Sequence, residues 1–299
     1  MSCSKYLLCA LALICLLPQA ASAALFRWDG GSGIGPFGGD NNWSTNTNWR
    51  PNPGGTAPPD DGTADIELTG GMRTTPNVDM TWSIKSRRIN LTSINGNFIL
   101  GGSTLTIGSG GLESVVTLGS GLVTGGPNTV NTDIVLGAAQ TWTGHNLVVE
   151  GDIDNDGHKL RIDLSSAPFT INGAISGTGG LEKAGFSAFD DRVVTLGGSG
   201  ANTHTGTTTV KGTLVLNKSA FDGAIFTDLV IGDGVRESVC NCADDRVRLD
   251  ASDQIRATVG TLVTNTVTIN RYGTLDLNGN SDAIGHMIID GGRSPVGEC

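Results

Sequence analysis

The sequence predicts an all-β protein of the right-handed parallel β-helix class, also called a β-solenoid. Three observations carry this prediction. Glycine accounts for 45 of the 299 residues, roughly twice its usual share. Short runs of alternating apolar residues recur along the chain, and Gly, Asn or Asp bounds each of them. Helical spacing of apolar residues is almost absent from the sequence.

The alternating runs begin near residue 64, and each is only about four or five residues long. Each places two or three apolar side chains on one face, as a half-buried strand does. Several share the form x-Leu-x-aliphatic, and such self-similarity indicates stacked repeats. The clearest runs are residues 97–100, 103–107, 146–149, 159–163, 192–196, 212–216, 266–269 and 273–277.

Short strands favour a coil over a β-sandwich, which is the alternative fold. A sandwich needs longer strands joined by hairpin turns, and very short strands cannot hold a hairpin together. Strands stacked in register along a coil instead pair above and below, and their inward Leu, Val and Ile side chains form a continuous ladder. At roughly 20 residues per turn, the chain predicts on the order of 12 to 14 rungs.

Residues 1–23 are predicted to be a cleaved signal peptide. Lys5 precedes an apolar run over residues 7–17, and Ala21-Ser22-Ala23 supplies the small-x-small pattern of a cleavage site. The run is shorter than the roughly 20 residues that span a bilayer, and no later stretch predicts a transmembrane span. The sequence therefore predicts export, with an extracellular or cell-surface location.

Residues 24–62 differ from the repeats and are interpreted as an N-terminal cap. They contain Trp28, Trp43 and Trp49 among Gly, Asn and Pro. A solenoid needs a cap to cover the apolar end of its first rung, and bulky indoles suit that role. An aromatic face that stacks against sugars is the alternative. Residues 63–299 are then the β-solenoid repeat region.

The net charge of −10 and the pI near 4.7 disfavour nucleic acid and anionic lipid as partners. Cys240, Cys242 and Cys299 remain after signal cleavage. Because three is an odd number, at least one of these thiols stays free or forms a disulfide with a second chain. Their pairing stays open. A two-sulfur C-x-C without nearby His is a poor zinc site.

Residues 178–217 resemble the autotransporter-associated β-strand repeat. The motifs are Thr-Gly-Gly-Leu-Glu-Lys-Ala-Gly over 178–185, Val-Thr-Leu-Gly-Gly-Ser-Gly-Ala-Asn-Thr-His-Thr-Gly over 194–206, and Thr-Thr-Val-Lys-Gly-Thr-Leu-Val-Leu-Asn over 208–217. His204 stands where an aromatic residue is usual, and 186–191 is longer and more polar than the usual link. The resemblance implies a β-helical passenger displayed outside the cell. It implies no catalytic residue set.

An acidic segment matches the spacing of a calcium loop. Asp152, Asp154 and Asp156 alternate before Gly157, and Asp163 takes the twelfth position. Lys159 stands where an apolar residue is normal, no helices flank the loop, and 159–163 also reads as a strand. An acidic turn between rungs is therefore the competing interpretation. No cofactor other than this calcium ion is predicted.

Other motifs carry little chemistry. The G-x-G-x-x-G match over 33–38 follows no predicted strand and opens no helix. The four histidines are far apart in sequence, without metal-ligand spacing. The adjacent acidic pairs at 60–61, 190–191 and 244–245 would point to opposite faces of a strand. No catalytic residue is predicted.

The sequence thus predicts an exported structural or adhesive solenoid without catalysis. The alternative is a β-helix that binds or cleaves polysaccharide, which would need grouped carboxylates or a cation with Arg or Lys on one face. Extracellular polysaccharide and other cell-surface components are the expected partners. The sequence shows no C-terminal barrel of strands, so we expect either a truncated passenger or a short secreted relative. In both cases, we expect the chain to self-associate through the open end of the solenoid.

Overall fold

The computed structural model describes residues 24–30, 39–50, 55–69, 73–80, 88–93, 97–116, 126–144, 146–164, 168–185, 192–235, 245–259 and 263–291. The predicted signal peptide, all six cysteines and the 33–38 motif lie outside these residues. Within them, no helix is long and apolar enough to cross a membrane.

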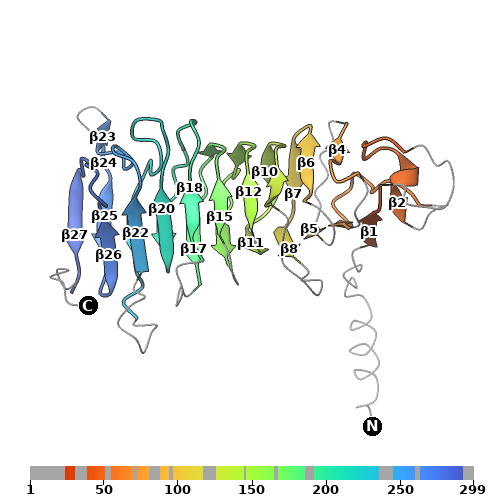
Figure 1. Ribbon diagram of the computed structural model, residues 1–299. Coiled ribbons are helices and arrows are strands. Elements are labelled where there is room, and N and C mark those ends of the chain that lie inside the picture. The colour runs from red at the N-terminus through yellow and green to blue at the C-terminus, as the bar shows by residue number, and fades with distance from the viewer. Residues whose placement is uncertain are drawn as a thin grey trace, which may run out of the picture.

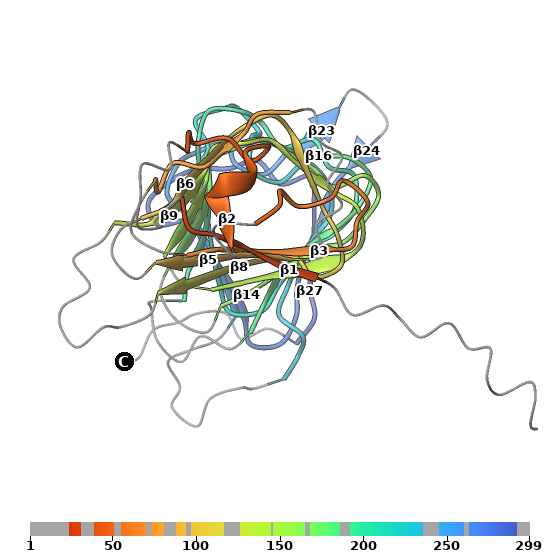
Figure 2. The ribbon, with the colours of Figure 1, turned by 90° about the vertical axis from the view of Figure 1, so that its right-hand side faces the viewer.

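The described residues form a parallel β-helix, which confirms the predicted fold class (Figures 1 and 2). The chain passes through three sheets in turn, here called A, D and C, and then returns to sheet A one rung further on. A β-sandwich is excluded because strand pairing within the three sheets is parallel, apart from one cap strand.

Sheet A runs the length of the stack. Its strands, in spatial order, are β2 (Trp49–Arg50), β1 (Ala24–Trp28), β3 (Ala64–Leu68), β5 (Arg88–Ser93), β8 (Leu112–Val116), β11 (Gln140–Gly144), β14 (Leu160–Asp163), β17 (Leu181–Ala184), β19 (Thr208–Val210), β21 (Leu229–Ile231), β25 (Thr266–Ile269) and β27 (His286–Ile289).

Sheets D and C complete the coil. Sheet D contains β4 (Asn77–Val78), β6 (Ile99–Gly102), β9 (Asn128–Val130), β12 (Leu147–Val149), β15 (Phe169–Ile171), β18 (Val194–Leu196), β20 (Thr213–Leu216), β22 (Asp245–Leu249) and β26 (Gly273–Asp276). Sheet C contains β7 (Leu105–Ile107), β10 (Ile134–Leu136), β13 (Ile153–Asp154) and β16 (Ile175–Ser176). A small antiparallel pair, β23 (Thr258–Val259) and β24 (Val263–Thr264), projects from a late rung.

Rung length explains why the stack is shorter than predicted. In the middle of sheet A, Gln140, Leu160 and Leu181 stand in register about 20 residues apart. Some later rungs are longer, and the step from Leu229 to Val267 takes almost twice that length. Twelve strands of sheet A are described, of which all but β2 run parallel. The described chain therefore contains eleven rungs, fewer than the 12 to 14 expected from an even repeat.

Each rung contributes one layer to a continuous apolar core. In sheet D, the inward side chains of successive rungs lie directly above one another, and all but the last are buried: Leu147, Phe169, Val194, Leu214, Val247 and the partly buried Leu275. Burying such a side chain stabilises the fold by about 1.5–3 kcal/mol. The alternating sequence is therefore the direct cause of the stack.

Buried amides tie the corners of successive rungs together. The side chain of Asn202 accepts a hydrogen bond from the backbone N–H of Ile175 at 2.9 Å and donates one to the carbonyl of Ala224 at 2.8 Å. Asn155 likewise joins Gly179 through both its oxygen and its nitrogen. These amides satisfy backbone groups that the corners remove from the strand ladders.

Three buried indoles close the N-terminal end, as predicted. Trp28, Trp43 and Trp49 are at most 1% exposed, and Trp49 packs edge-on against the other two at 5.4 and 5.6 Å between ring centroids. Strand β2 pairs antiparallel with β1 and so covers the outer edge of sheet A. The buried indoles offer no face to a sugar, so the alternative of a tryptophan stacking platform is wrong.

Candidate functional site

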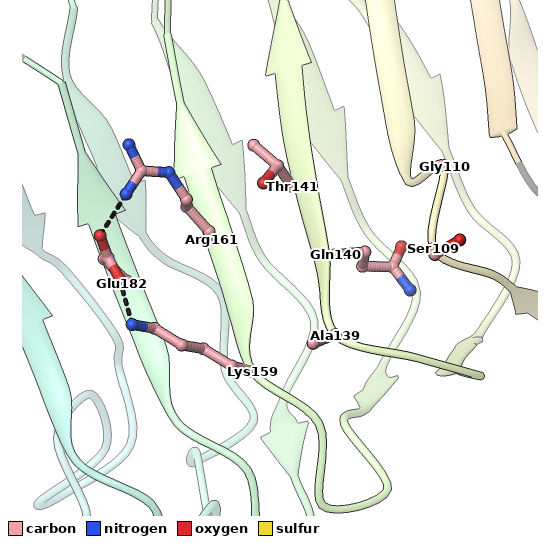
Figure 3. Close-up of a pocket in the computed structure, with 8 residues that line it drawn as sticks. All are labelled: Ser109, Gly110, Ala139, Gln140, Thr141, Lys159, Arg161 and Glu182. Carbon is pink, nitrogen blue, oxygen red and sulfur yellow. Dashed lines mark hydrogen bonds and ion pairs between the residues drawn. The ribbon is translucent and has the colours of Figure 1, made fainter.

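The described residues form a shallow hollow on sheet A. It has a volume of about 440 Å³ and lies across β8, β11, β14 and β17 (Figure 3). Its lining comes from successive rungs: Ser109, Gly110, Ala139, Gln140, Thr141, Lys159, Arg161 and Glu182. The parallel stacking places these residues together although they are spread over four rungs of sequence.

Charged residues occupy one side of the hollow. Glu182 forms ion pairs with both Lys159 and Arg161 (Figure 3), and Arg161 also pairs with Asp163 at 3.0 Å between Nη2 and Oδ2. The register explains the arrangement, because Arg161 of β14 stands directly beside Glu182 of β17. The two cations and two carboxylates balance one another in charge.

The lowered pKa of Glu182 suits a carboxylate that forms ion pairs and does not suit a general acid. Burial by itself raises the pKa of Glu182, but the hydrogen bond and charge of Lys159, together with the charges of Arg161 and Lys211, outweigh burial and lower the pKa. Glu182 is therefore ionised at neutral pH, whereas a general acid needs a raised pKa. The side chains of Lys159 and Arg161 remain 54% and 40% exposed, so both can also reach a ligand.

The opposite side of the hollow is polar but uncharged. Gln140 directs its side chain into the rung, where its amide donates to the carbonyl of Ile107 at 2.9 Å and its oxygen accepts from the indole of Trp142 at 2.8 Å. Thr141 stands in register with Arg161 on the outer face. The hollow can therefore hold an extended polar chain whose acidic substituents reach Lys159 and Arg161.

Two of the four predicted calcium ligands, Asp154 and Asp163, lie on strands of different sheets, and the other two lie in turns. Asp152 lies in the turn before β13, where its carboxylate accepts the backbone N–H of Ala174 at 2.7 Å. Asp154 ends β13 and caps the turn by accepting the N–H of Asp156 at 2.9 Å. Asp163 lies on β14 in sheet A and pairs with Arg161. The structure therefore separates Asp163 from the others.

The turn itself has the sharp geometry expected from the sequence. Asp156 and Gly157 both adopt positive φ, at 45° and 80°. Among the described residues, no group of three or more His, Cys, Asp or Glu side chains is arranged to hold a metal ion. Calcium binding stays a prediction, and the observed contacts of Asp152 and Asp154 are those of turn residues.

The remaining sequence candidates fall in separate places. His158 and His286 lie in different rungs, and His204 is fully buried. Asp61 binds the N–H of Thr63 within an exposed turn at 3.0 Å. Asp245 is buried in β22 and accepts the N–H of Gly212 at 2.6 Å. The other members of these sets that lie outside the described residues are His145, Asp190, Asp191 and Asp244.

The charge cluster around Glu182 was not predicted. Its signal is present in the sequence, because a charged residue directly follows the leucine in both Leu160-Arg161 and Leu181-Glu182. Aligning them on Leu160 and Leu181 places Arg161 beside Glu182. The alignment becomes informative only when the two runs are known to be neighbouring rungs.

The motifs of residues 178–217 build consecutive strands of the coil. The first motif contains β17, the second begins with β18 and continues into the buried corner of Asn202 and His204, and the third contains β19 and β20. A scan of protein-family models finds no match to this chain, and no curated protein or solved structure matches it.

Proposed function

We propose that this protein is an exported structural or adhesive β-solenoid, similar to the passenger regions that carry autotransporter-associated repeats, and that it acts without catalysis. One observation supports it most: the described residues build one stack in which sheet A passes through every rung (Figure 1). A stack held by backbone pairing along its whole length is stiff, and stiffness suits a protein that presents surface away from a cell.

The pattern of surface charge agrees with a structural role. Charged side chains on sheet A pair from rung to rung, as in Arg27 with Glu67 and Arg161 with Glu182. Arg246 and Asp276 pair in the same way on sheet D. Such pairs hold neighbouring rungs in register and leave the exterior polar.

Two measurements test export and the absence of catalysis. In the native cell, the exported chain should carry Ala24 as its first residue when its N-terminus is sequenced. Incubated with acidic and neutral polysaccharides, the purified chain should release no reducing ends and no unsaturated sugars. Release of either product would overturn the structural proposal.

Polysaccharide binding in the hollow beside Glu182 is the second candidate function. It is favoured by the exposed cations Lys159 and Arg161 next to the neutral floor formed by Ala139 and Thr141. The expected ligand is a polysaccharide with carboxylate or sulfate groups, which would compete with Glu182 for these cations.

Titration calorimetry with a polyuronate separates this candidate from a purely structural role. K159A/R161A should weaken binding at least about tenfold. The control is K211A, because Lys211 directly follows β19 of the same sheet but pairs with Asp233 and does not line the hollow. Equal affinity in all three proteins, or no binding at all, would remove the hollow as a polysaccharide site.

A further inference from the structure

The C-terminal end of the stack exposes a layer that is buried in the preceding rung. In β27, Met287 and Ile289 continue the inward ladders of Val267 and Ile269. The two residues of β25 are 1% and 9% exposed, whereas Met287 and Ile289 are 42% and 60% exposed. Within the described residues, the core of the coil is therefore open at this end.

The backbone of β27 is also open along one edge. His286 and Asp290 donate their N–H groups to Asn265 and Ile269 of the preceding rung. Alternate residues of a strand in a parallel sheet bond to opposite neighbours. Met287 and Ile289 therefore direct their backbone N–H and C=O groups away from β25, toward the outer edge.

The other end of the stack is partly covered, by a strand that pairs with Arg27 and Trp28. There, β2 lies antiparallel on the outside of β1, and the indoles of Trp43 and Trp49 are buried in the cap. Head-to-tail stacking of identical chains would have to displace both. Pairing of two C-terminal ends displaces neither, because both β27 edges are open.

We propose that the open end binds a second copy of this chain, tail to tail, through antiparallel pairing of β27 with its counterpart. A two-fold axis perpendicular to sheet A reverses strand direction and keeps both cores on the same side of the joined sheet. Sheet A then continues from one copy into the other. This inference does not depend on the proposed function.

The sequence of β27 is self-complementary in one register. With Ile288 on the two-fold axis, Met287 stands opposite Ile289 of the other copy, and both point inward. His286 stands opposite Asp290 of the other copy, so a hydrogen-bonded polar pair flanks the apolar contact at each end. The backbone groups that β27 leaves open, those of Met287 and Ile289, form the reciprocal hydrogen bonds of this antiparallel pair.

Neighbouring registers fit less well. A shift of pairing by one residue would oppose inward and outward side chains, which a sheet does not allow. A shift by two residues would place Gly285 or Gly291 opposite one of the inward apolar residues. The register with Ile288 on the two-fold axis is therefore the one that covers both Met287 and Ile289. It is also the one that places His286 opposite Asp290.

Sedimentation velocity of the purified full chain in reducing solution tests the proposal, since reduction excludes covalent dimers through cysteine. We expect a reversible monomer–dimer equilibrium that ends at the dimer. I288K places two ammonium groups on the axis and should raise the dissociation constant about tenfold or more. Ile288 points outward, so the monomer should keep its fold, which the far-UV spectrum checks.

Two further variants make the test specific to this register. T268K is the matched control for I288K, because Thr268 occupies the same outward ladder one rung earlier, and it should leave dimerisation unchanged. H286D should weaken the dimer by opposing two acids, and H286D/D290H should restore it.

A chain that stays monomeric at tens of micromolar would overturn the proposal. Growth into long polymers would overturn it in favour of head-to-tail stacking. A dimer that is indifferent to both I288K and H286D would place the contact elsewhere on the molecule.

Discussion

His204 is a titratable side chain sealed inside the coil. It is fully buried, and Nε2 lies 3.0 Å from the hydroxyl of Thr208. Within the described part of the chain, Nδ1 has no hydrogen-bond partner. Burial lowers the pKa of His204 to about 4, although the nearby backbone of Ile175 opposes that shift. The folded state therefore favours the neutral imidazole of His204.

Acid should weaken the fold through His204. Because the folded pKa lies below the ordinary value of 6.5, the unfolded chain binds the proton more tightly. The stability is complete above pH 6.5 and falls as the pH drops through 6.5 toward 4. The loss should reach on the order of 3 kcal/mol. Urea unfolding of the wild type and of H204F at several pH values measures it, and equal slopes in the two proteins would contradict it.

Glycine is required where rungs approach most closely. A Cβ on Gly173 would lie 1.9 Å from the carbonyl oxygen of Gly151 in the rung before, whereas one on Gly101 would meet nothing within 4 Å. G173A should therefore cost about 1–3 kcal/mol or more through overpacking. G101A is the control and should change the free energy of unfolding by less than about 1 kcal/mol. Denaturant unfolding checks both, and two equal effects would refute the crowding argument.

At the scale of elements, the cap differs from the rungs that it covers. The rungs gain stability from strands above and below, whereas the first rung has a neighbour on one side only. The indoles of Trp28, Trp43 and Trp49 fill the open end, and the Nε1 group of Trp49 donates to the carbonyl of Trp43 at 2.8 Å. The cap is thus a small aromatic core that replaces the missing rung.

Removal of the central indole should open this end. W49A should cost about 3–5 kcal/mol, the usual effect of truncating a buried Trp to Ala. R27A, on the neighbouring strand β1, should cost no more than about 1 kcal/mol, because Arg27 is half exposed and its partner Glu67 also reaches solvent. Thermal unfolding compares the two, and similar losses would show that Trp49 does not hold the cap.

At the scale of the whole molecule, a stacked coil has unequal ends. The N-terminal end is closed by the cap, and the C-terminal end exposes Met287 and Ile289. Every rung between them is covered on both sides. Stability should therefore vary along the axis, because local opening is easiest where few buried contacts are lost.

Hydrogen exchange should reveal this difference in local stability along the axis. At low protein concentration, backbone amides of β27 should exchange fastest, those of β12 and β15 slowest, and those of β1 at an intermediate rate. At high concentration, the amides of Met287 and Ile289 should slow selectively if the ends pair. Mass spectrometry after proteolysis resolves these segments. Uniform exchange rates along the coil would contradict the expected difference between its ends and its middle.

The sequence by itself determined the elements and the kind of fold. All eight of the clearest alternating runs contain or overlap a strand, because a period of two is a local property that burial of one face selects. The tryptophans of residues 24–62 likewise indicated the cap, since bulky apolar groups outside the repeat need a core of their own. The sequence did not determine the number of rungs, because insertions between strands do not alter the local pattern.

Only the tertiary structure decided which rungs are neighbours. Register brings Glu182 beside Lys159 and Arg161, and separates Asp163 from Asp152 and Asp154. Exposure of β27 was likewise decided by its place at the end of the stack, because its alternation resembles that of the buried strands. The physical reason is that alternation fixes which face of a strand is buried, whereas pairing between rungs depends on the length of chain between them.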